Sequence, residues 1–250
     1  MRHNYKLKLE YNGSEFHGSQ IQDKERTVQG ELDKALNRFM GQDGLWFKNS
    51  IDIETSFSSR TDTGVHAIGQ IVNFKTDQVI PETSNNPDKI LLALNSQLPE
   101  DMVLTKIEEV PLEFHSRFHA QSREYLYKIF IRRHRPVLRL DSLMWQKEPL
   151  DYLRMAKHAQ TFIGARDFSN YASVDPNQDP DSICTVIESE LIKESEICYK
   201  YRIKANRFLR HMVRRIVGEL IQVGKGLEPN EDTCKHAAAA SGLTLMKVEY

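Results

Sequence analysis

The sequence contains few cysteines and no long apolar segment. Its 250 residues include only Cys184, Cys198 and Cys234. Their odd number and wide spacing argue against a disulfide framework and against a CxxC zinc motif. No apolar run approaches the ~20 residues that a membrane-spanning helix needs, and the first residues lack the apolar core of a signal peptide. We therefore expect a cytoplasmic protein that makes no membrane contact.

Common cofactor and metal motifs are missing as well. The chain has no P-loop, no GxGxxG and no GxSxG sequence, so nothing in it indicates a nucleotide cofactor or a hydrolase nucleophile. His115 and His119 are four residues apart, but their surroundings do not resemble a helix and no carboxylate follows at zincin spacing. We accordingly predict no metal and no cofactor.

The net charge of −1 hides an uneven distribution of charge. Residues 117–139 carry seven lysines and arginines against one glutamate, and residues 200–225 carry eight against one. Acidic residues gather instead at 77–113 and 175–196. Such asymmetry is expected of a surface that binds phosphates, as in RNA, although solvated faces of a helix or strand would give the same counts.

The most informative stretch is the polar loop 59–67, Ser-Arg-Thr-Asp-Thr-Gly-Val-His-Ala. It precedes the strand-like run 71–74, and polar residues in a loop held by rigid elements often bind or react. If the chain is extended there, Arg60 and Asp62 share a face, so that the guanidinium would favour the ionised carboxylate. A structural ion pair in a turn and a functional site both fit this spacing.

Hydrophobic periodicity predicts two similar halves. In each half an alternating strand, at 5–11 and 197–205, precedes an amphipathic helix, at 28–40 and 212–224. Further strands are expected near 102–108 and 124–131, and further helices near 88–97 and 150–163. Thr27 is a candidate N-cap and Gly41 a candidate helix end. We predict an α+β protein with antiparallel sheets, and a mobile loop at 173–183.

Two further groups of residues could bind RNA. Tyr125 and Tyr127 share one face of a strand that begins near Arg123, which suits base stacking beside a phosphate contact, although one ring could be core and the other rim. Arg207, Arg210 and Arg214 recur every three or four residues. They would form one cationic stripe if the helix begins early enough, or otherwise a solvated face.

With these groups in view, the chain resembles the tRNA pseudouridine synthase A (TruA) family over nearly its whole length. Residues 60–67, RTDTGVHA, resemble the RTDxGVHA signature of that family. Other matching fragments follow in the same order along both chains: Tyr11-Asn12-Gly13, 26–32, Gly69-Gln70, 94–99, 114–117, 123–127, Asp167-Phe168 and 208–218.

The resemblance implies a fold, a domain division and an activity. It implies two α/β halves, at 1–105 with the aspartate loop and at 106–250 with the basic strand and helix, whose antiparallel sheets meet to form a central RNA-binding cleft. The activity is isomerisation of uridine to pseudouridine in the anticodon stem–loop of tRNA, at positions 38–40. Metal and organic cofactors are not needed, and the family is usually homodimeric.

The resemblance also implies roles for individual residues. Asp62 would be the catalytic carboxylate and nucleophile, although whether it attacks C1′ or promotes a glycal route stays open. Arg60 would take part in base flipping, Tyr125 would pack on the target base, and Arg214 would pair with Asp62. Further candidate substrate contacts are Arg123, Tyr127, Arg207, Arg210 and His66.

Some positions depart from the family pattern. Gly18-Ser19-Gln20 stands where Gly-Trp-Gln is common, and Ser59 stands where glycine usually precedes the arginine. An arginine is missing near 182–186, and a proline is missing in 239–243. These departures leave open which uridine and which RNA are modified. A non-catalytic or retargeted RNA-binding paralogue, and an N-glycosidase that uses the same aspartate, are the alternatives.

Overall fold

The structure is a computed structural model that describes residues 2–40, 53, 55–80, 86–138, 142–173 and 181–250. The chain folds into two compact units, Met1–Ala120 with Tyr250, and Gln121–Glu249. No helix in the described part of the chain is both long and apolar enough to cross a membrane.

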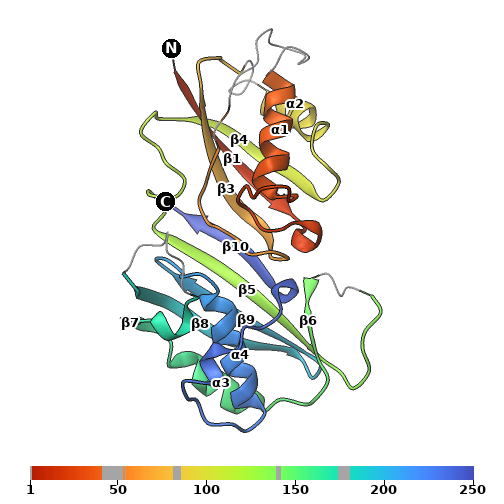
Figure 1. The fold of residues 1–250 in the computed structure, drawn as a ribbon, viewed down its shortest axis with the longest axis vertical. Coiled ribbons are helices and arrows are strands. Elements are labelled where there is room, and N and C mark those ends of the chain that lie inside the picture. Colours follow the sequence, from red (N-terminus) through yellow and green to blue (C-terminus); the bar gives the residue numbers. More distant parts are fainter. Residues whose placement is uncertain (1, 41–52, 54, 81–85, 139–141, 174–180) are drawn as a thin grey trace. The chain divides into compact units, whose positions relative to one another are not determined.

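The first unit is a small antiparallel sheet covered by two helices (Figure 1). Strand β1 (His3–Tyr11) lies between β4 (Met102–Val110) and β3 (His66–Thr76), and the short β2 (Thr55–Phe57) pairs with the other edge of β3. The 3-10 turn η1 (Gly13–Glu15) follows β1, and the helices are α1 (Val28–Met40) and α2 (Pro87–Asn95).

The core of this unit follows from the strand periodicity of β1 and the helical periodicity of α1. Alternate residues of β1, including Leu7 and Leu9, are fully buried on one face of the sheet, and Leu32 and Leu36 of α1 are fully buried as well. Thr27 caps α1, because its Oγ1 accepts a hydrogen bond from the amide of Gly30 at 3.2 Å. This packing fixes the ends of β1 and β3, from which the polar loops emerge.

The second unit repeats this plan with a larger sheet. Its strands lie in the order β10 (Leu243–Glu249), β5 (Ser122–Ile131), β9 (Cys198–Ala205), β8 (Ile183–Ser195) and β7 (Gly164–Asp167), all antiparallel. The short β6 (Met144–Gln146) pairs with β5 in parallel. Helices α3 (Tyr152–Gln160) and α4 (Met212–Gly224) cover one face (Figure 1). The described part of the unit also contains the 3-10 turns η3 (Ser169–Tyr171), η4 (Thr233–Lys235) and η5 (Ala240–Gly242).

The predicted α+β class, the antiparallel sheets and the strand–helix plan of both halves are confirmed. The sequence did not predict the short strands β2, β6 and β7, nor the longer β8 and β10. In β8 the register shifts between Val186 and Glu188, and Ile183 and Ile187 are exposed, so the apolar residues do not alternate regularly along the strand. Gly41 and most of the loop 173–183 lie outside the described residues.

Two predictions need a different description. The compact units divide the chain between residues 120 and 121, whereas the boundary expected at 105–106 falls inside β4. The cationic stripe required an early helix start and does not form, because α4 begins only at Met212. His211 before it has a left-handed backbone with φ 65°, which ends any helical continuation toward Arg207 and Arg210.

Candidate active site

The loop that carries Asp62 joins β2 to β3, and its entry is fixed by a buried glutamine. Gln70 of β3 is fully buried, and its Oε1 accepts a hydrogen bond from Ser58 Oγ at 2.7 Å. Its Nε2 donates to the carbonyl of Ser59 at 2.9 Å, and the amide of Ser58 donates to the carbonyl of Ile71 at 2.8 Å. The chain therefore leaves the sheet in one defined direction.

The middle of the loop is held through the backbone of Thr61. The amide of Thr61 donates to Ser19 Oγ at 2.8 Å, and the amide of Ser19 donates back to the carbonyl of Thr61 at 3.0 Å. The hydroxyls of Thr61 and Tyr11 lie 2.8 Å apart. Burial raises the pKa of Tyr11 to about 12. Both backbone groups of Thr61, the residue before Asp62, are thus paired in a buried setting.

Two glycines let the segment after β1 approach this loop. A Cβ on Gly13 would lie 2.0 Å from the carbonyl oxygen of Val65. Gly18 has φ +93°, and a Cβ there would lie 2.9 Å from the carbonyl oxygen of Thr61. His66 completes the contact, because its Nδ1 accepts the amide hydrogen of Gly13 at 3.0 Å. His66 is 6% exposed, so this ring supports the loop from inside.

Asp62 is the first residue of a tight turn that directly follows Thr61. Its carbonyl accepts the amide of Val65 at 3.1 Å, and Gly64 within the turn has φ +80°. The side chain of Asp62 is half-buried, whereas that of Arg60 is exposed. Hydrogen bonds at Thr61 and Val65, and from Gln70, hold the backbone on both sides of Asp62. A carboxylate that takes part in chemistry has to be held in place in this way.

The aromatic pair on β5 divides into two different environments. Tyr125 is 5% exposed and meets Phe208 edge-on, with ring centroids 5.2 Å apart. Tyr127 is fully buried, its hydroxyl donates to the carbonyl of Ala239 at 2.7 Å, and its ring lies where a side chain on Gly242 would be. Tyr127 is therefore enclosed by the core of the second unit.

The arginines of the second unit are spread over one connection and one helix. Arg123 is 9% exposed and donates from Nη1 to the carbonyl of Asn206 at 2.8 Å, so it supports the segment between β9 and α4. Nη1 of Arg207 lies 3.6 Å from Oδ2 of Asp181, and the side chain of Arg210 is exposed. Arg214 is half-buried on α4 and donates from Nε to the carbonyl of Ala238 at 2.8 Å.

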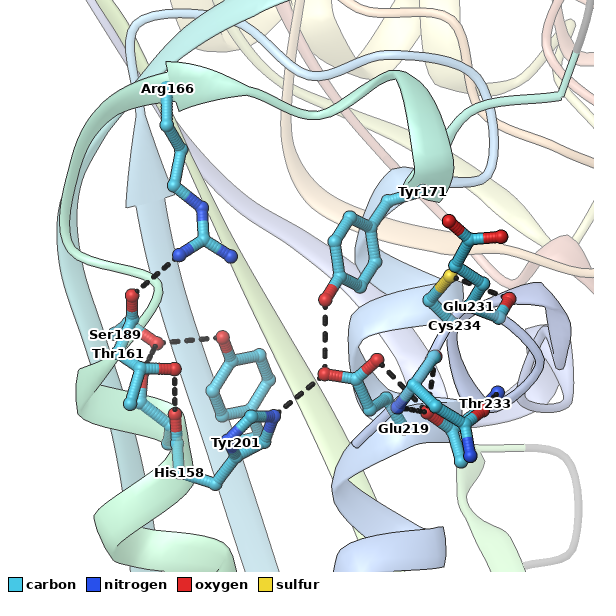
Figure 2. A network of polar contacts seen from close by, with 12 residues as sticks. His158, Thr161, Arg166, Tyr171, Ser189, Tyr201, Glu219, Glu231, Thr233 and Cys234 are labelled. Atoms are coloured by element: carbon cyan, nitrogen blue, oxygen red, sulfur yellow. Dashed lines mark hydrogen bonds and ion pairs between the residues drawn. The ribbon is translucent and has the colours of Figure 1, made fainter. Parts of the chain in front are cut away.

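A buried carboxyl group fixes α4, the helix that carries Arg214 (Figure 2). Glu219 is 2% exposed, and its Oε1 lies 2.6 Å from Nε2 of His158 on α3. The Tyr171 hydroxyl donates to the same oxygen at 3.0 Å, and Thr233 Oγ1 donates to Oε2 at 3.3 Å. One side chain thus joins α3, η3, α4 and η4. In the described part of the chain, no group of three or more His, Cys, Asp or Glu could hold a metal ion.

The structure adds residues that sequence reasoning did not single out. Ser19 and Tyr11 hold the loop, but the sequence showed Ser19 only as a departure and Tyr11 only as part of a family fragment. Gly13 and Gly18 in the segment after β1 were the available signal, since two glycines close together suggest a close backbone approach. Arg60, Asp62 and His66 lie in the first unit, and the other candidates lie in the second.

Comparison with known proteins agrees with this arrangement. A family model described as tRNA pseudouridine synthase matches residues 9–119 and 158–250, which include the Asp62 loop, β9 and α4. The chain belongs to the tRNA pseudouridine synthase family. It is 37% identical to tRNA pseudouridine synthase A of Halalkalibacterium halodurans, over 94% of this chain and 84% of that protein. It is 36% identical to tRNA pseudouridine synthase A of Dictyoglomus thermophilum, over 99% of both chains.

A tRNA pseudouridine synthase is an isomerase, so membership makes this protein an enzyme of tRNA modification. The similarity extends to "tRNA pseudouridine synthase A 2" of Bacillus cereus, at 32% identity over 99% of this chain. The resemblance drawn from the sequence is confirmed, and so is the enzyme class.

Proposed function

We propose that this pseudouridine synthase modifies uridines in the anticodon stem–loop of tRNA, at positions 38–40, with Asp62 as its catalytic carboxylate. In this isomerisation the bond between N1 and C1′ of uridine breaks and a bond between C5 and C1′ forms. The proton on C5 leaves and N1 gains one, so the product has the composition of the substrate. A carboxylate can act at C1′ without any metal or organic cofactor.

The observation that carries this proposal is the support of the Asp62 loop. Ser19, Tyr11 and Gln70 form hydrogen bonds with the loop before Asp62, and His66, four residues after Asp62, accepts the amide hydrogen of Gly13. A reacting group has to be held near its productive position, and these hydrogen bonds hold the backbone near Asp62. Asp62 is the one acidic residue between Ser58 and His66.

The other residues receive their roles from substrate chemistry. A uridine within a folded stem must leave its stack before a carboxylate can reach C1′. The exposed Arg60 is two residues from Asp62 and suits that step as a flipping residue. In the proposal Tyr125 packs on the flipped base, and Arg214 is the ion-pair partner of Asp62, as the resemblance implies. Arg123 acts on this site only by supporting the segment that begins at Asn206.

The test uses a tRNA transcript that carries tritium at C5 of its uracils. We expect the wild-type protein to release tritium without releasing free uracil. The Asp62→Asn variant should lower the release by at least about 10³-fold, since it removes an essential catalytic group. Asp23→Asn, which alters an exposed acid in the loop after β1, is the matched control and should retain full release.

Each alternative has its own result in this assay. Free uracil would identify an N-glycosidase, and tRNA binding without any release would identify a non-catalytic paralogue. Release that survives Asp62→Asn would reject Asp62 as the catalytic residue. Mapping of pseudouridines in tRNA, in cells with and without the protein, tests positions 38–40. Sedimentation of the purified protein tests the homodimer, and fractionation of cells tests the cytoplasmic location.

A further inference from the structure

An exposed aromatic ring stands on the turn that follows β4. Among the described residues, Phe118 is the most exposed Phe, Tyr or Trp, at 74%, and Tyr250 follows at 37%. The aromatic turn, residues 114–119, lies within the first unit and has the sequence Phe-His-Ser-Arg-Phe-His. Burial of a large ring is favourable, so a ring left in water on a structured turn suggests a partner that covers it.

Buried hydrogen bonds hold the aromatic turn in place. Ser116 at its centre is fully buried, and its amide donates to Asn73 Oδ1 at 2.8 Å. The Ser116 hydroxyl donates to the carbonyl of Ser56, and the Tyr250 hydroxyl donates to the carbonyl of Ser116 at 2.8 Å. Asn4 donates to the carbonyl of Phe114 at 2.9 Å. The backbone below Phe118 is therefore fixed to β1, β2 and β3 before any partner arrives.

The ring itself is supported on one side and flanked by positive charge. His115 packs against Phe118 with ring centroids 4.4 Å apart, and the Arg117 guanidinium carbon lies 5.8 Å from the centre of the Phe118 ring. Lys75 is exposed on β3, and Glu113 is the one acidic residue in 111–120. The pKa of His115 is lowered first by burial and then by the positive charges of His119, Lys75 and Arg117.

We propose that the aromatic turn is a second RNA contact of this enzyme, in which an unpaired nucleobase stacks on Phe118 while Arg117 and Lys75 meet the adjoining phosphates. Aromatic rings flanked by cations are the usual means of binding single-stranded RNA. Lysine is depleted in protein–protein interfaces, so the exposed Lys75 beside the turn argues against a second protein as the occupant. The proposal rests on the proposed tRNA substrate and extends it to a base other than the target uridine.

The test compares binding of an unmodified tRNA transcript with binding of a blunt RNA duplex that has no unpaired base. We expect Phe118→Ala to weaken binding of the transcript by about 5- to 150-fold, the loss typical of one stacked base. Binding of the duplex should not change. Phe118→Trp keeps a stacking face and should retain affinity. Arg117→Ala should reduce the slope of log K against log salt by about 1.

Leu92→Ala is the matched control, because Leu92 of α2 is also 74% exposed in the first unit. It should leave RNA binding unchanged. Equal affinity of wild type and Phe118→Ala for the transcript would overturn the proposal. So would a loss of self-association in Phe118→Ala without loss of RNA affinity, since the ring would then meet a second copy of the chain. Pseudouridine formation by the wild type is measured separately. The proposed activity can therefore fail while this RNA contact is supported, and the RNA contact can fail while the activity is supported.

Discussion

Replacement of Ser19 by alanine is the sharpest test of how the Asp62 loop is held. The change removes one oxygen atom, which accepts the amide hydrogen of Thr61 at 2.8 Å. Ser19 is fully buried, so water cannot readily take the place of that oxygen. The amide of Ser19 still donates to the carbonyl of Thr61, so the backbone contact is weakened and not abolished.

The size of the effect follows from the group left behind. A buried amide without an acceptor costs about 1–3 kcal/mol. We expect the chain to relieve this cost by a shift at Thr61, which moves the next residue, Asp62. A misplacement of about 1 Å can lower a reaction rate by on the order of 10²-fold. Ser19→Ala should therefore lower kcat by about 10- to 100-fold, whereas KM for tRNA should change little because RNA contacts elsewhere are kept.

The assay measures kcat and KM from tritium release, together with unfolding in urea. Ser189→Ala is the matched control. Ser189 is 2% exposed in the second unit, and its hydroxyl donates to the carbonyl of Ala159 at 2.7 Å. Both variants should lose stability, but only Ser19→Ala should lose kcat. The thiol of Ser19→Cys is a weaker acceptor, so this variant should fall between wild type and alanine.

Two results would refute this reasoning. An unchanged kcat in Ser19→Ala, with stability lowered as in Ser189→Ala, would mean that Ser19 is only a packing residue. An equal loss of kcat in both variants would mean that general loss of stability, and not the position of the loop, limits the rate.

Three further predictions concern stability and RNA binding. The pKa of Tyr11 is raised to about 12 by burial from 10.0, so its contribution to stability is complete below pH 10 and is lost as pH rises toward 12. Over this range the free energy of unfolding, measured in urea, should therefore fall less steeply with pH in Tyr11→Phe than in the wild type, by about 1.4 kcal/mol per pH unit. An equal slope in the two proteins would contradict the prediction. Glu219→Gln should lower the free energy of unfolding by about 1–3 kcal/mol, because it weakens the contact with His158, and unaltered urea midpoints would contradict this. Arg210→Glu should weaken tRNA binding and lessen its salt dependence, unlike Arg210→Lys, and equal binding at several salt concentrations would reject a role for this exposed residue.

Local periodicity predicted most of the fold, and its failures have local causes. The alternation in β1 and the helical spacing in α1 and α4 are strong because each element has one buried face. Apolar periodicity predicted the start of α4 at Met212, and only the spacing of the arginines pointed to an earlier start. The spacing of Arg207, Arg210 and Arg214 suits a helix, and a left-handed residue such as His211 interrupts it only because tertiary contacts compensate. One such contact is the 2.7 Å hydrogen bond between His211 Nδ1 and Ser173 Oγ.

The sequence pointed to the proposed reacting residue of the candidate site but not to the residues that support it. Asp62 stands out because carboxylate, arginine and glycine are adjacent in sequence. Gln70 and Tyr11 reach the loop from neighbouring strands, and such contacts between residues 11 and 50 positions apart leave no periodic trace. His66 is a different case. Its place beside Asp62 suggested a substrate contact, yet its ring accepts a backbone hydrogen bond inside the first unit.

The departure at position 19 acquires a physical meaning from the structure. The serine hydroxyl accepts a hydrogen bond from the amide of Thr61. The indole of tryptophan, which is common at this place in the family, only donates. The loop before Asp62 is therefore held in this chain by a contact that a tryptophan there cannot make. Because the contact lies one residue from the proposed catalytic group, this substitution bears on where Asp62 lies more directly than on how strongly RNA binds.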